Sequence, residues 1–375
     1  MKEWDSPLNP FNSLKVLMWR RHLEGCAKKD FLIPVTVDID PSNKCNFRCI
    51  WCNAYDMIHS SQKNMPEDHM IRLCDFIASW GKDRAEGNPK SACIAGGGEP
   101  LINPGTMALL ERMKHNGLES GLITNGSLLN DERIDIIAKT CRWVGISMDS
   151  ATPETFVKVK FGDTGTAKDG LFDKIVENIR KLAKRIGSLG TKCDLCYKYL
   201  LHPYNATEIL DAVRLARDIG VKDFHLRPVG WDNLTVTQQK AKLDFESLIG
   251  IINKQLEEAM KLNSSSFHVY GIRHKFNTDF SLKRSFSSCL AIPLLPTFGA
   301  DGNVHTCFDR RGDKDLVMCK HIPDPTEISR YWNSEAHHKL LESIDVNNCP
   351  RCTFGPYNEI VEKVFLEDSM CKFFP

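Results

Sequence analysis

Residues 34–52 read PVTVDIDPSNKCNFRCIWC, and this stretch joins an alternating strand to three closely spaced cysteines. Val35, Val37 and Ile39 alternate with polar residues, a period of two that is typical of a β-strand with one apolar and one polar face. The cysteines follow on the loop that leads from this strand toward the next helix. The stretch therefore predicts a strand with a cysteine-rich loop at its carboxyl end.

The same unit, a short apolar strand followed by an amphipathic helix, recurs along the chain. We predict further strands at residues 92–95, 121–124, 143–148, 192–201 and 224–228. Helical periodicity marks residues 67–80, 106–116, 131–139, 172–186 and 206–219. This alternation indicates a parallel sheet with crossover helices, and six units are too few for a closed eight-stranded barrel. The predicted fold is α/β, a partial (β/α)6 TIM barrel.

The polar faces of these strands should line the inside of the barrel. Helices cover the outside, so the apolar face of each strand packs outward and the polar face points into the lumen. On the fifth and sixth strands the inward residues include Lys198, His225 and Arg227. The lumen is therefore the expected active-site cavity.

Cys45, Cys49 and Cys52 place three thiols within eight residues. Three thiolates leave one iron of a [4Fe–4S] cube without a protein ligand, and an open iron can bind a substrate. Zinc is the alternative, although it usually takes four ligands in two pairs and His59 is the only nearby fourth candidate. The C-x3-C-x2-C spacing, with the aromatic Trp51 before the last cysteine, resembles the motif of the radical S-adenosylmethionine (radical SAM) superfamily. In that family the open iron binds the amino and carboxylate groups of SAM.

Further motifs extend the resemblance over about residues 33–230. The GGGEP segment, residues 96–100, looks like the glycine-rich motif that binds the SAM amino group. There, glycine lets the backbone approach the methionine and the carboxylate accepts from its ammonium. The third and fourth strands end in TNG and in Ser-x-Asp, and the latter lies near the SAM ribose in the family. The cofactor-binding residues that the resemblance implies are Trp51, Gly97, Gly98, Glu99, Thr124, Asn125, Ser147 and Asp149.

Two interpretations stay open for Lys198, His225 and Arg227. As inward residues they could contact the SAM carboxylate or the substrate, and Lys198 and Arg227 are the candidate catalytic residues. Each could equally belong to a structural ion pair, with Asp38 or Asp194 as its partner.

A second group of cysteines lies near the end of the chain, at Cys289, Cys307, Cys349 and Cys352. The pattern resembles the twitch domain, a shorter relative of the SPASM domain that follows many radical SAM barrels and holds one auxiliary [4Fe–4S] cluster. Four thiolates would occupy all four irons. A structural zinc ribbon is the alternative, because four cysteines in two loops also suit zinc.

Two more cysteines leave that ligand set open. Cys319 or Cys371 could replace Cys307, or could cap a site that is left open for substrate. The full SPASM pattern continues with further cysteines after the C-x-x-C, whereas residues 353–369 contain none. We therefore predict one auxiliary cluster rather than two.

These assignments divide the chain into four parts. A helical lead-in occupies residues 1–32, and the radical SAM partial barrel occupies residues 33–230. A helical linker over residues 231–285 leads into a small α+β, cysteine-rich twitch or SPASM-like domain at residues 286–375.

Composition narrows the classes of function. Hydrophobic residues make up 42% and charged residues 26% of the 375 residues, as expected of a chain that folds throughout. The 49 Lys and Arg residues nearly balance the 48 Asp and Glu residues, so the chain lacks the excess of positive charge expected of a dedicated nucleic-acid binder. No apolar run is long enough for a signal peptide or a membrane span, so we expect a cytoplasmic protein. In that reducing compartment fifteen cysteines favour cluster binding over disulfides.

The resemblance implies an enzyme of the oxidoreductase type that reductively cleaves SAM to a 5′-deoxyadenosyl radical and abstracts hydrogen from its substrate. Electrons would come from a donor such as flavodoxin or ferredoxin. Twitch-containing relatives favour a small polar substrate, such as a sugar or aminocyclitol, in a dehydrogenase or epimerase reaction with electron relay through the auxiliary cluster. A peptide-modifying enzyme is the close alternative. A non-catalytic iron–sulfur or zinc redox sensor is the alternative from another class.

Overall fold

A computed structural model describes residues 13–60, 63–162, 165, 169–229, 243, 245–271, 284–349 and 352–366 of the chain. Its organising element is one sheet with the strand order β10-β9-β8-β1-β2-β3-β4-β5-β6-β7. The strands are β1 Thr36–Ile39, β2 Ser91–Ile94, β3 Glu119–Thr124, β4 Trp143–Ser147, β5 Asp194–Leu201, β6 Asp223–Pro228, β7 His268–Gly271, β8 Thr297–Phe298, β9 Asn303–His305 and β10 Val317–Lys320.

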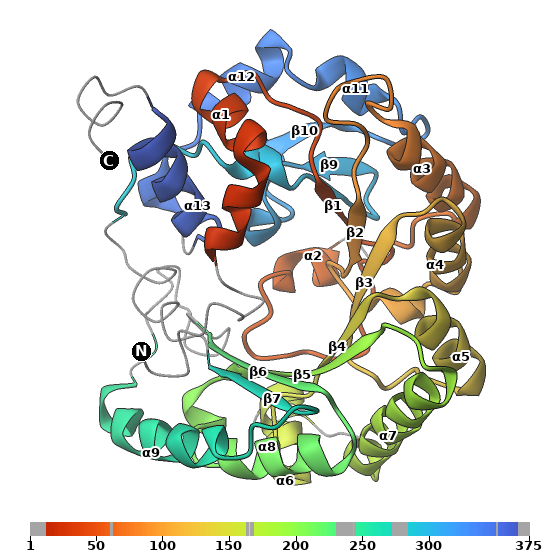
Figure 1. Ribbon diagram of the computed structural model, residues 1–375, viewed down its shortest axis with the longest axis vertical. Coiled ribbons are helices and arrows are strands. Elements are labelled where there is room, and N and C mark those ends of the chain that lie inside the picture. The colour runs from red at the N-terminus through yellow and green to blue at the C-terminus, as the bar shows by residue number, and fades with distance from the viewer. Residues whose placement is uncertain are drawn as a thin grey trace.

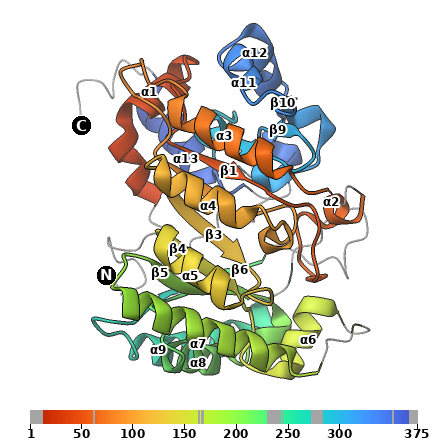
Figure 2. The ribbon, with the colours of Figure 1, turned by 90° about the vertical axis from the view of Figure 1, so that its right-hand side faces the viewer.

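The strands from β1 to β7 are all parallel, and helices cover their outer face (Figure 1). The helices are α1 Arg20–Lys28, α2 Tyr55–Ser60, α3 Glu67–Ser79, α4 Thr106–His115, α5 Asp131–Thr140, α6 Pro153–Phe161, α7 Leu171–Leu189, α8 Ile209–Asp218, α9 Ile249–Met260, α11 Glu327–Tyr331, α12 Glu335–Glu342 and α13 Gly355–Ile360. Figure 2 shows α3, α4, α5 and α7 side by side along the outside of the sheet. The sheet runs from β10 to β7 without closing, so the architecture is an open partial barrel, as predicted.

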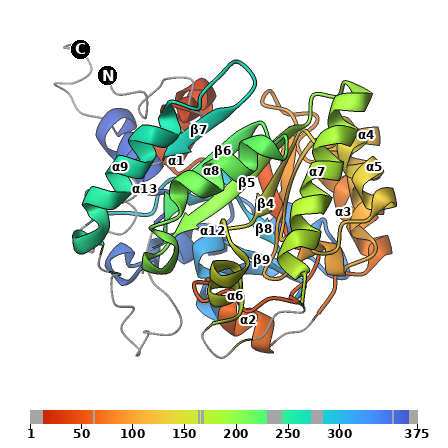
Figure 3. The same ribbon diagram turned by 90° about the horizontal axis from the view of Figure 1, so that it is seen from below.

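All six predicted strands are present, with ends that differ from the predicted ones by at most two residues. A seventh parallel strand, β7, pairs with β6 and comes from the segment predicted to be a linker. Helix α9 precedes β7 and lies beside α8 (Figure 3). Buried Phe267 and Val269 carry the period-two pattern of this strand, but two apolar residues after a polar stretch do not distinguish a strand from a polar connection. The predicted domain boundaries stay a prediction.

Helix α6 was not among the predicted helices, although its start has a local signal. Thr152 caps the helix, because its hydroxyl accepts a hydrogen bond from the Thr155 N–H at 3.3 Å, and Pro153 occupies the first turn. A threonine followed by proline is a recognised start of a helix. This helix matters because its last turn contacts the three-cysteine loop.

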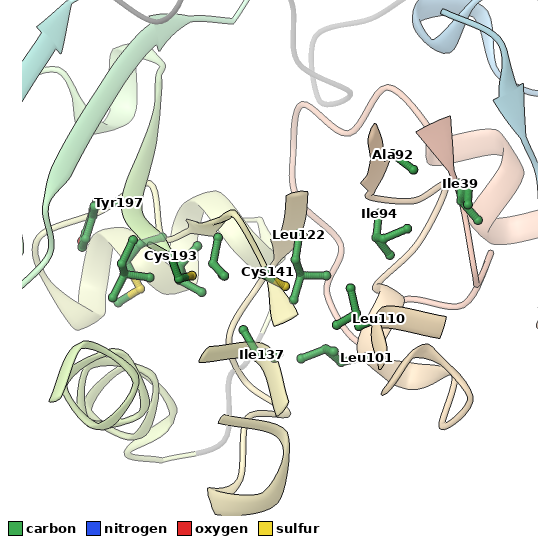
Figure 4. Close-up of a cluster of buried hydrophobic side chains, with 14 of the residues drawn as sticks. Ile39, Ala92, Ile94, Leu101, Leu110, Leu122, Ile137, Cys141, Cys193 and Tyr197 are labelled. Atoms are coloured by element: carbon green, nitrogen blue, oxygen red, sulfur yellow. The ribbon is translucent and has the colours of Figure 1, made fainter. Parts of the chain in front are cut away.

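The core lies between the sheet and its outer helices. Figure 4 shows Ile94 and Leu122 from neighbouring strands together with Leu110 of α4 and Ile137 of α5, and all four side chains are fully buried. The apolar face of each strand therefore packs outward against helices, as the alternation predicted. The opposite, polar face is left to line the lumen.

The C-terminal region extends the sheet at the β1 edge. Strand β8 pairs in parallel with β1, while β9 and β10 continue in antiparallel order. The Trp332 indole N–H donates to the Phe31 carbonyl at 3.1 Å, and the Phe31 N–H donates to the Asn333 side chain at 3.1 Å. The C-terminal region is thus packed against the chain that enters β1.

No helix in the described ranges is long and apolar enough to cross a membrane.

Candidate functional site

The three-cysteine loop, residues 45–52, lies at the carboxyl end of β1 and leads into α2. Its backbone is fixed to the end of α6 by two hydrogen bonds. The Arg48 N–H donates to the Lys160 carbonyl at 3.0 Å, and the Ile50 N–H donates to the Val159 carbonyl at 3.1 Å. The loop is therefore held by a helix that lies more than a hundred residues later in the chain.

The three thiols of this loop lie close enough to influence one another. Burial raises the pKa of both Cys45 and Cys52 to about 12, and the neighbouring Cys49 thiol contributes in the same direction. Burial raises the pKa of Cys49 as well, although the Lys160 ammonium opposes this shift. Each side chain nevertheless keeps partial exposure. A bound metal reverses this preference for the thiol form, because a coordinating thiol is deprotonated.

These thiols fit an iron–sulfur cluster better than a single ion. Each iron of a cluster takes its own thiolate, so the sulfurs need not converge on one point. In the described part of the chain, no three His, Cys, Asp or Glu side chains are arranged to hold a single metal ion. His59, the candidate fourth zinc ligand, has its Nδ1 within 2.6 Å of the Tyr55 carbonyl.

The GGGEP segment packs directly against the start of the cysteine loop. The Gly98 N–H donates to the Ser42 carbonyl at 2.9 Å, and the Glu99 N–H donates to the Lys44 carbonyl at 2.8 Å. A Cβ atom on Gly98 would lie 2.1 Å from the Lys44 oxygen, and one on Gly97 would lie 2.4 Å from Met57 Sδ. In this structure glycine is required because the segment approaches the cysteine loop itself. Contact with the SAM methionine stays a prediction.

Glu99 joins the GGGEP segment to the end of β3. Its Oε1 accepts from the Thr124 hydroxyl at 2.6 Å and from the Leu101 N–H at 3.1 Å, while Oε2 accepts from the Asn125 N–H at 2.8 Å. Burial raises the pKa of Glu99, and these hydrogen bonds oppose the shift. Thus Glu99 and Thr124 contact each other here, and their predicted contacts with SAM stay a prediction.

The TNG segment also reaches the cysteine loop. Asn125 Nδ2 donates to Asn46 Oδ1 at 2.8 Å, and Asn46 Nδ2 donates to the Ser127 hydroxyl at 2.8 Å. Asn46 lies directly after Cys45 and was not among the predicted site residues. Its position inside the cysteine motif could have indicated a role in the site, but an asparagine in a loop is also common where it only stabilises a turn.

Asp149 has a buried cation as its partner. The residue follows β4 with a φ of 61°, and its Oδ1 accepts from the Leu200 N–H at 2.6 Å. Its Oδ2 pairs with Lys160 Nζ at 2.5 Å, where each side chain is only 1% exposed, and Nζ also donates to the Ser147 carbonyl at 2.8 Å. Burial lowers the pKa of Lys160, but Asp149 and the nearby thiols of Cys49 and Cys45 together outweigh this effect, and the pKa stands above its ordinary value. The predicted contacts of Ser147 and Asp149 with the SAM ribose stay a prediction.

Trp51 is buried at 7% exposure. It packs in a small apolar cluster with Ile50, Val159 and Val229, and its ring centroid lies 5.7 Å from that of His202. The aromatic residue of the motif therefore attaches the loop to α6 and to the residue after β6, and its SAM-binding role stays a prediction.

The structure brings the four C-terminal cysteines together. Burial raises the pKa of Cys289 well above its ordinary range, and the Cys307, Cys352 and Cys349 thiols act in the same direction. Cys319 lies on β10. Burial raises its pKa and Glu327 adds to the rise, whereas the four thiols do not contribute. Cys371 lies outside the described residues. The proximity of the four thiols fits the predicted ligand set.

The two cysteine sites are neighbours. Asn53, directly after Cys52, donates through Nδ2 to the carbonyl of Phe308, directly after Cys307, at 3.5 Å. From the same C-terminal loop Arg311 reaches β1, where its Nε lies 2.7 Å from Asp40 Oδ2 and its Nη2 lies 3.5 Å from Asp38 Oδ2. Burial raises the pKa of Asp38 to about 7, and the guanidinium opposes this shift. Arg311 was not predicted, since a surface arginine and a buried one look alike in sequence.

The structure shows which cations pair with Asp38 and Asp194, the two predicted partners of the lumen side chains. Asp38 pairs with Arg311, and Asp194 pairs with Arg142 at 3.0 Å and with Lys222 at 2.5 Å. Among the described ion pairs, neither Asp38 nor Asp194 is paired with Lys198, so the structural alternative for this lysine is wrong. The distant Arg311 occupies the carboxylate of β1 instead.

Replacing Gly98 with alanine should separate the GGGEP segment from the cysteine loop, because the new methyl group would overlap the Lys44 oxygen. If Cys45, Cys49 and Cys52 hold the predicted cluster, we expect Gly98→Ala to lose most of its iron and the predicted binding of SAM to weaken at least tenfold. Iron analysis and equilibrium dialysis with labelled SAM measure both effects. Gly187→Ala is the matched control, because a Cβ there meets nothing within 4 Å. Equal iron and SAM binding in the two variants would contradict the packing role of Gly98.

Residues 39–216 of the chain match the sequence model of the Radical SAM superfamily. This range includes the cysteine loop, the GGGEP segment, the end of β3 and the Asp149–Lys160 pair. A GTP 3′,8-cyclase of Clostridium perfringens is 28% identical over 199 residues, which cover 51% of this chain and 55% of that protein. The chain spans about half the length of the curated relatives it matches.

Solved structures with the same fold cover more of the chain. Streptococcus suis SuiB bound to precursor peptide SuiA superposes with a TM-score of 0.61 at 16% identity, covering 98% of this chain and 82% of that one. The protein anSMEcpe with bound AdoMet and Cp18Cys peptide superposes with a TM-score of 0.57 at 15% identity, covering 86% and 87%. At these identities the two structures show a shared fold.

Proposed function

We propose that Cys45, Cys49 and Cys52 hold a [4Fe–4S] cluster and that the enzyme abstracts hydrogen from a polar substrate in its lumen. The proposal follows from the radical SAM domain of the chain, because domains of this kind use a [4Fe–4S] cluster and SAM. One observation supports this most: three half-buried thiols gather on one loop, Asn125 is hydrogen-bonded to Asn46 within it, and the GGGEP segment is hydrogen-bonded to Ser42 and Lys44 directly before it. Supporting hydrogen bonds of this kind hold the residues of a site in a fixed geometry.

When bound, the cluster and SAM supply reductive cleavage of SAM to a 5′-deoxyadenosyl radical. The residues of the chain position and shield that chemistry. Gly98 and Glu99 hold the GGGEP segment beside Cys45, and Asn46 connects the loop to Asn125. Lys160 places a buried positive charge beside Cys49, and this charge offsets part of the negative charge that deprotonated thiols bring.

We also propose that Cys289, Cys307, Cys349 and Cys352 hold an auxiliary [4Fe–4S] cluster in a twitch or SPASM-like domain. Their proximity supports this assignment. The contact between the Cys52 and Cys307 loops would suit electron relay between the centres, which a dehydrogenase needs in order to remove the second electron from the substrate radical. A flavodoxin or ferredoxin is the proposed electron donor.

For the substrate we propose a small polar molecule, because charged side chains of β1, β5 and β6 face the lumen. The similarity to GTP 3′,8-cyclases over half the chain favours a small anionic metabolite over the sugar or aminocyclitol that the sequence predicted. A peptide is the second candidate, since SuiB and anSMEcpe were solved with peptides and share the fold.

The test begins with anaerobic reconstitution of the full chain and incubation with SAM and a strong reductant. We expect 5′-deoxyadenosine to form, and its absence would favour the non-catalytic redox sensor. A metabolite extract from cells grown on deuterated medium then identifies the substrate class. We expect deuterium to enter 5′-deoxyadenosine from a low-molecular-mass fraction. Transfer from a peptide fraction alone would contradict the small-molecule assignment.

A further inference from the structure

The register of the parallel strands orders the lumen into rows of side chains. Ser147 of β4 is level with Lys198 of β5, which is level with His225 of β6 and Tyr270 of β7. Because strand residues alternate between the two faces, these four side chains share the lumen face. Arg227 lies two residues further along β6, on the same face.

Two glycines lie nearer the start of the strands than this row: Gly145 is level with Cys196, and Gly121 is level with Trp143. A Cβ on Gly145 would lie 2.1 Å from Lys198 Cε, so the lysine side chain lies flat across β4. A Cβ on Gly121 would lie 2.2 Å from the Trp143 ring, so the indole lies flat across β3 in the same way. The Lys198 ammonium lies 5.4 Å from the centroid of that ring. The glycines thus direct Lys198 toward the interior of the lumen and away from the carboxyl ends of the strands.

The nearby acidic side chains already have partners of their own. Asp149 pairs with Lys160, Asp38 and Asp40 pair with Arg311, and Asp223 lies 3.2 Å from His268. Within the described ranges the Lys198 ammonium makes no ion pair and no hydrogen bond, and it lies over the face of the Trp143 ring. A half-buried ammonium without a counter-charge is costly unless a ligand supplies one.

The other groups in the row increase the positive potential. Burial lowers the pKa of Lys198, and Arg227 adds to the effect. Burial also lowers the pKa of His225 well below its ordinary value, and both Lys198 and Arg227 act in the same direction. His225 is therefore neutral near pH 7, so this half of the lumen holds two cations beside a neutral imidazole.

We propose that Lys198 is the centre of an anion-binding site that seats a carboxylate or phosphate group against β4, β5 and β6. The inference rests on the proposed function, and it specifies the substrate as an anion. Its Nζ would donate to the anionic oxygen, Arg227 would add a second positive charge, and Trp143 would form an apolar wall. A charge-assisted hydrogen bond in this sheltered lumen is stronger than one in water.

The anionic group has two possible sources, the substrate and the carboxylate of SAM. The predicted SAM contacts lie at the carboxyl ends of the strands, whereas the Lys198 side chain points toward Trp143 at the start of β4. This placement favours a substrate group that enters the lumen beyond SAM.

The experiment uses the reconstituted full chain with SAM bound, and pyrophosphate and acetate as probes. Lys198→Met keeps the aliphatic side chain over Gly145 but removes the charge, and Lys254→Met on the exposed face of α9 is the matched control. We expect Lys198→Met to bind at least one probe more than tenfold more weakly by calorimetry, while its affinity for SAM changes less than twofold. Lys198→Arg should recover part of the probe binding.

Three results would overturn the proposal: neither probe binds the unmodified protein, both variants bind the probes equally, or Lys198→Met loses affinity for SAM instead. The last result would assign the lysine to the SAM carboxylate. A failure of the proposed function would be seen separately. The unmodified protein would then form no 5′-deoxyadenosine, whether or not it binds pyrophosphate or acetate.

Discussion

Replacing Cys45, Cys49 and Cys52 together with alanine is expected to abolish SAM cleavage and to lower the iron content from about eight to about four per chain, following one cluster of four irons at each cysteine site. The remaining iron should stay because Cys289, Cys307, Cys349 and Cys352 lie together without help from the first loop. Each single alanine variant should lose SAM cleavage as well, since two thiolates leave a second iron without its ligand. Iron analysis, electron paramagnetic resonance and 5′-deoxyadenosine assays measure these effects.

The control for this experiment is Cys141→Ala. Cys141 is a buried cysteine of the outer core and belongs to neither site, so its replacement should leave the iron content unchanged (Figure 4). Undiminished 5′-deoxyadenosine in any of the three single variants would end the radical SAM assignment of this loop. Zinc instead of iron in the triple variant would contradict the auxiliary cluster and with it the electron relay.

Replacing Arg311 with methionine is expected to destabilise the protein by about 3–5 kcal/mol, the usual cost of leaving buried charges without their partner. Arg311 is 7% exposed, and Asp38 and Asp40 are 10% and 0% exposed in the same ion pairs. The loss should appear as a lower unfolding temperature. It should also weaken the contact of the Cys307 loop with the three-cysteine loop, so we expect SAM cleavage to fall at least tenfold.

The pH dependence of this variant provides a further test. A carboxyl group whose pKa is raised in the folded state binds more protons when folded, so its contribution to stability declines as the pH rises from its unfolded value toward its folded value. Burial raises the pKa of Asp38 to about 7 even with the guanidinium present. Without Arg311 that rise should be larger, so the difference in stability between the variant and the unmodified protein should be smaller at pH 5 than at pH 8.

Arg330→Met is the matched control for Arg311→Met. Arg330 is 77% exposed and pairs with Glu327 at the surface, where an ion pair contributes at most about 1 kcal/mol. If Arg311→Met lowers the unfolding temperature no more than Arg330→Met does, the buried ion pairs of β1 do not hold the two cysteine loops together.

The local patterns of the chain were sufficient to predict the six strands from β1 to β6 and the cysteine motif. A buried parallel strand shows its period of two within four to eight residues, and C-x3-C-x2-C lies within eight. Patterns that are shorter or interrupted were harder to read. Strand β7 lies directly after a polar stretch, so it was assigned to a linker, and α6 was overlooked despite its Thr152-Pro153 start.

The sequence by itself determined the open α/β barrel, its polar lumen and the residue types that can hold a cluster, because periodicity and ligand spacing are properties of neighbouring residues. Only the tertiary structure decided which charges meet. Asp38 and Arg311 are 273 residues apart in the chain, and Asp149 is paired with Lys160 from a helix that was not predicted. These partners also bear on the anion-binding site proposed at Lys198, since Asp38 and Asp194 are paired with other cations and not with its ammonium. Ion pairing between distant residues depends on where the folded backbone places each charge, and no local pattern records that placement.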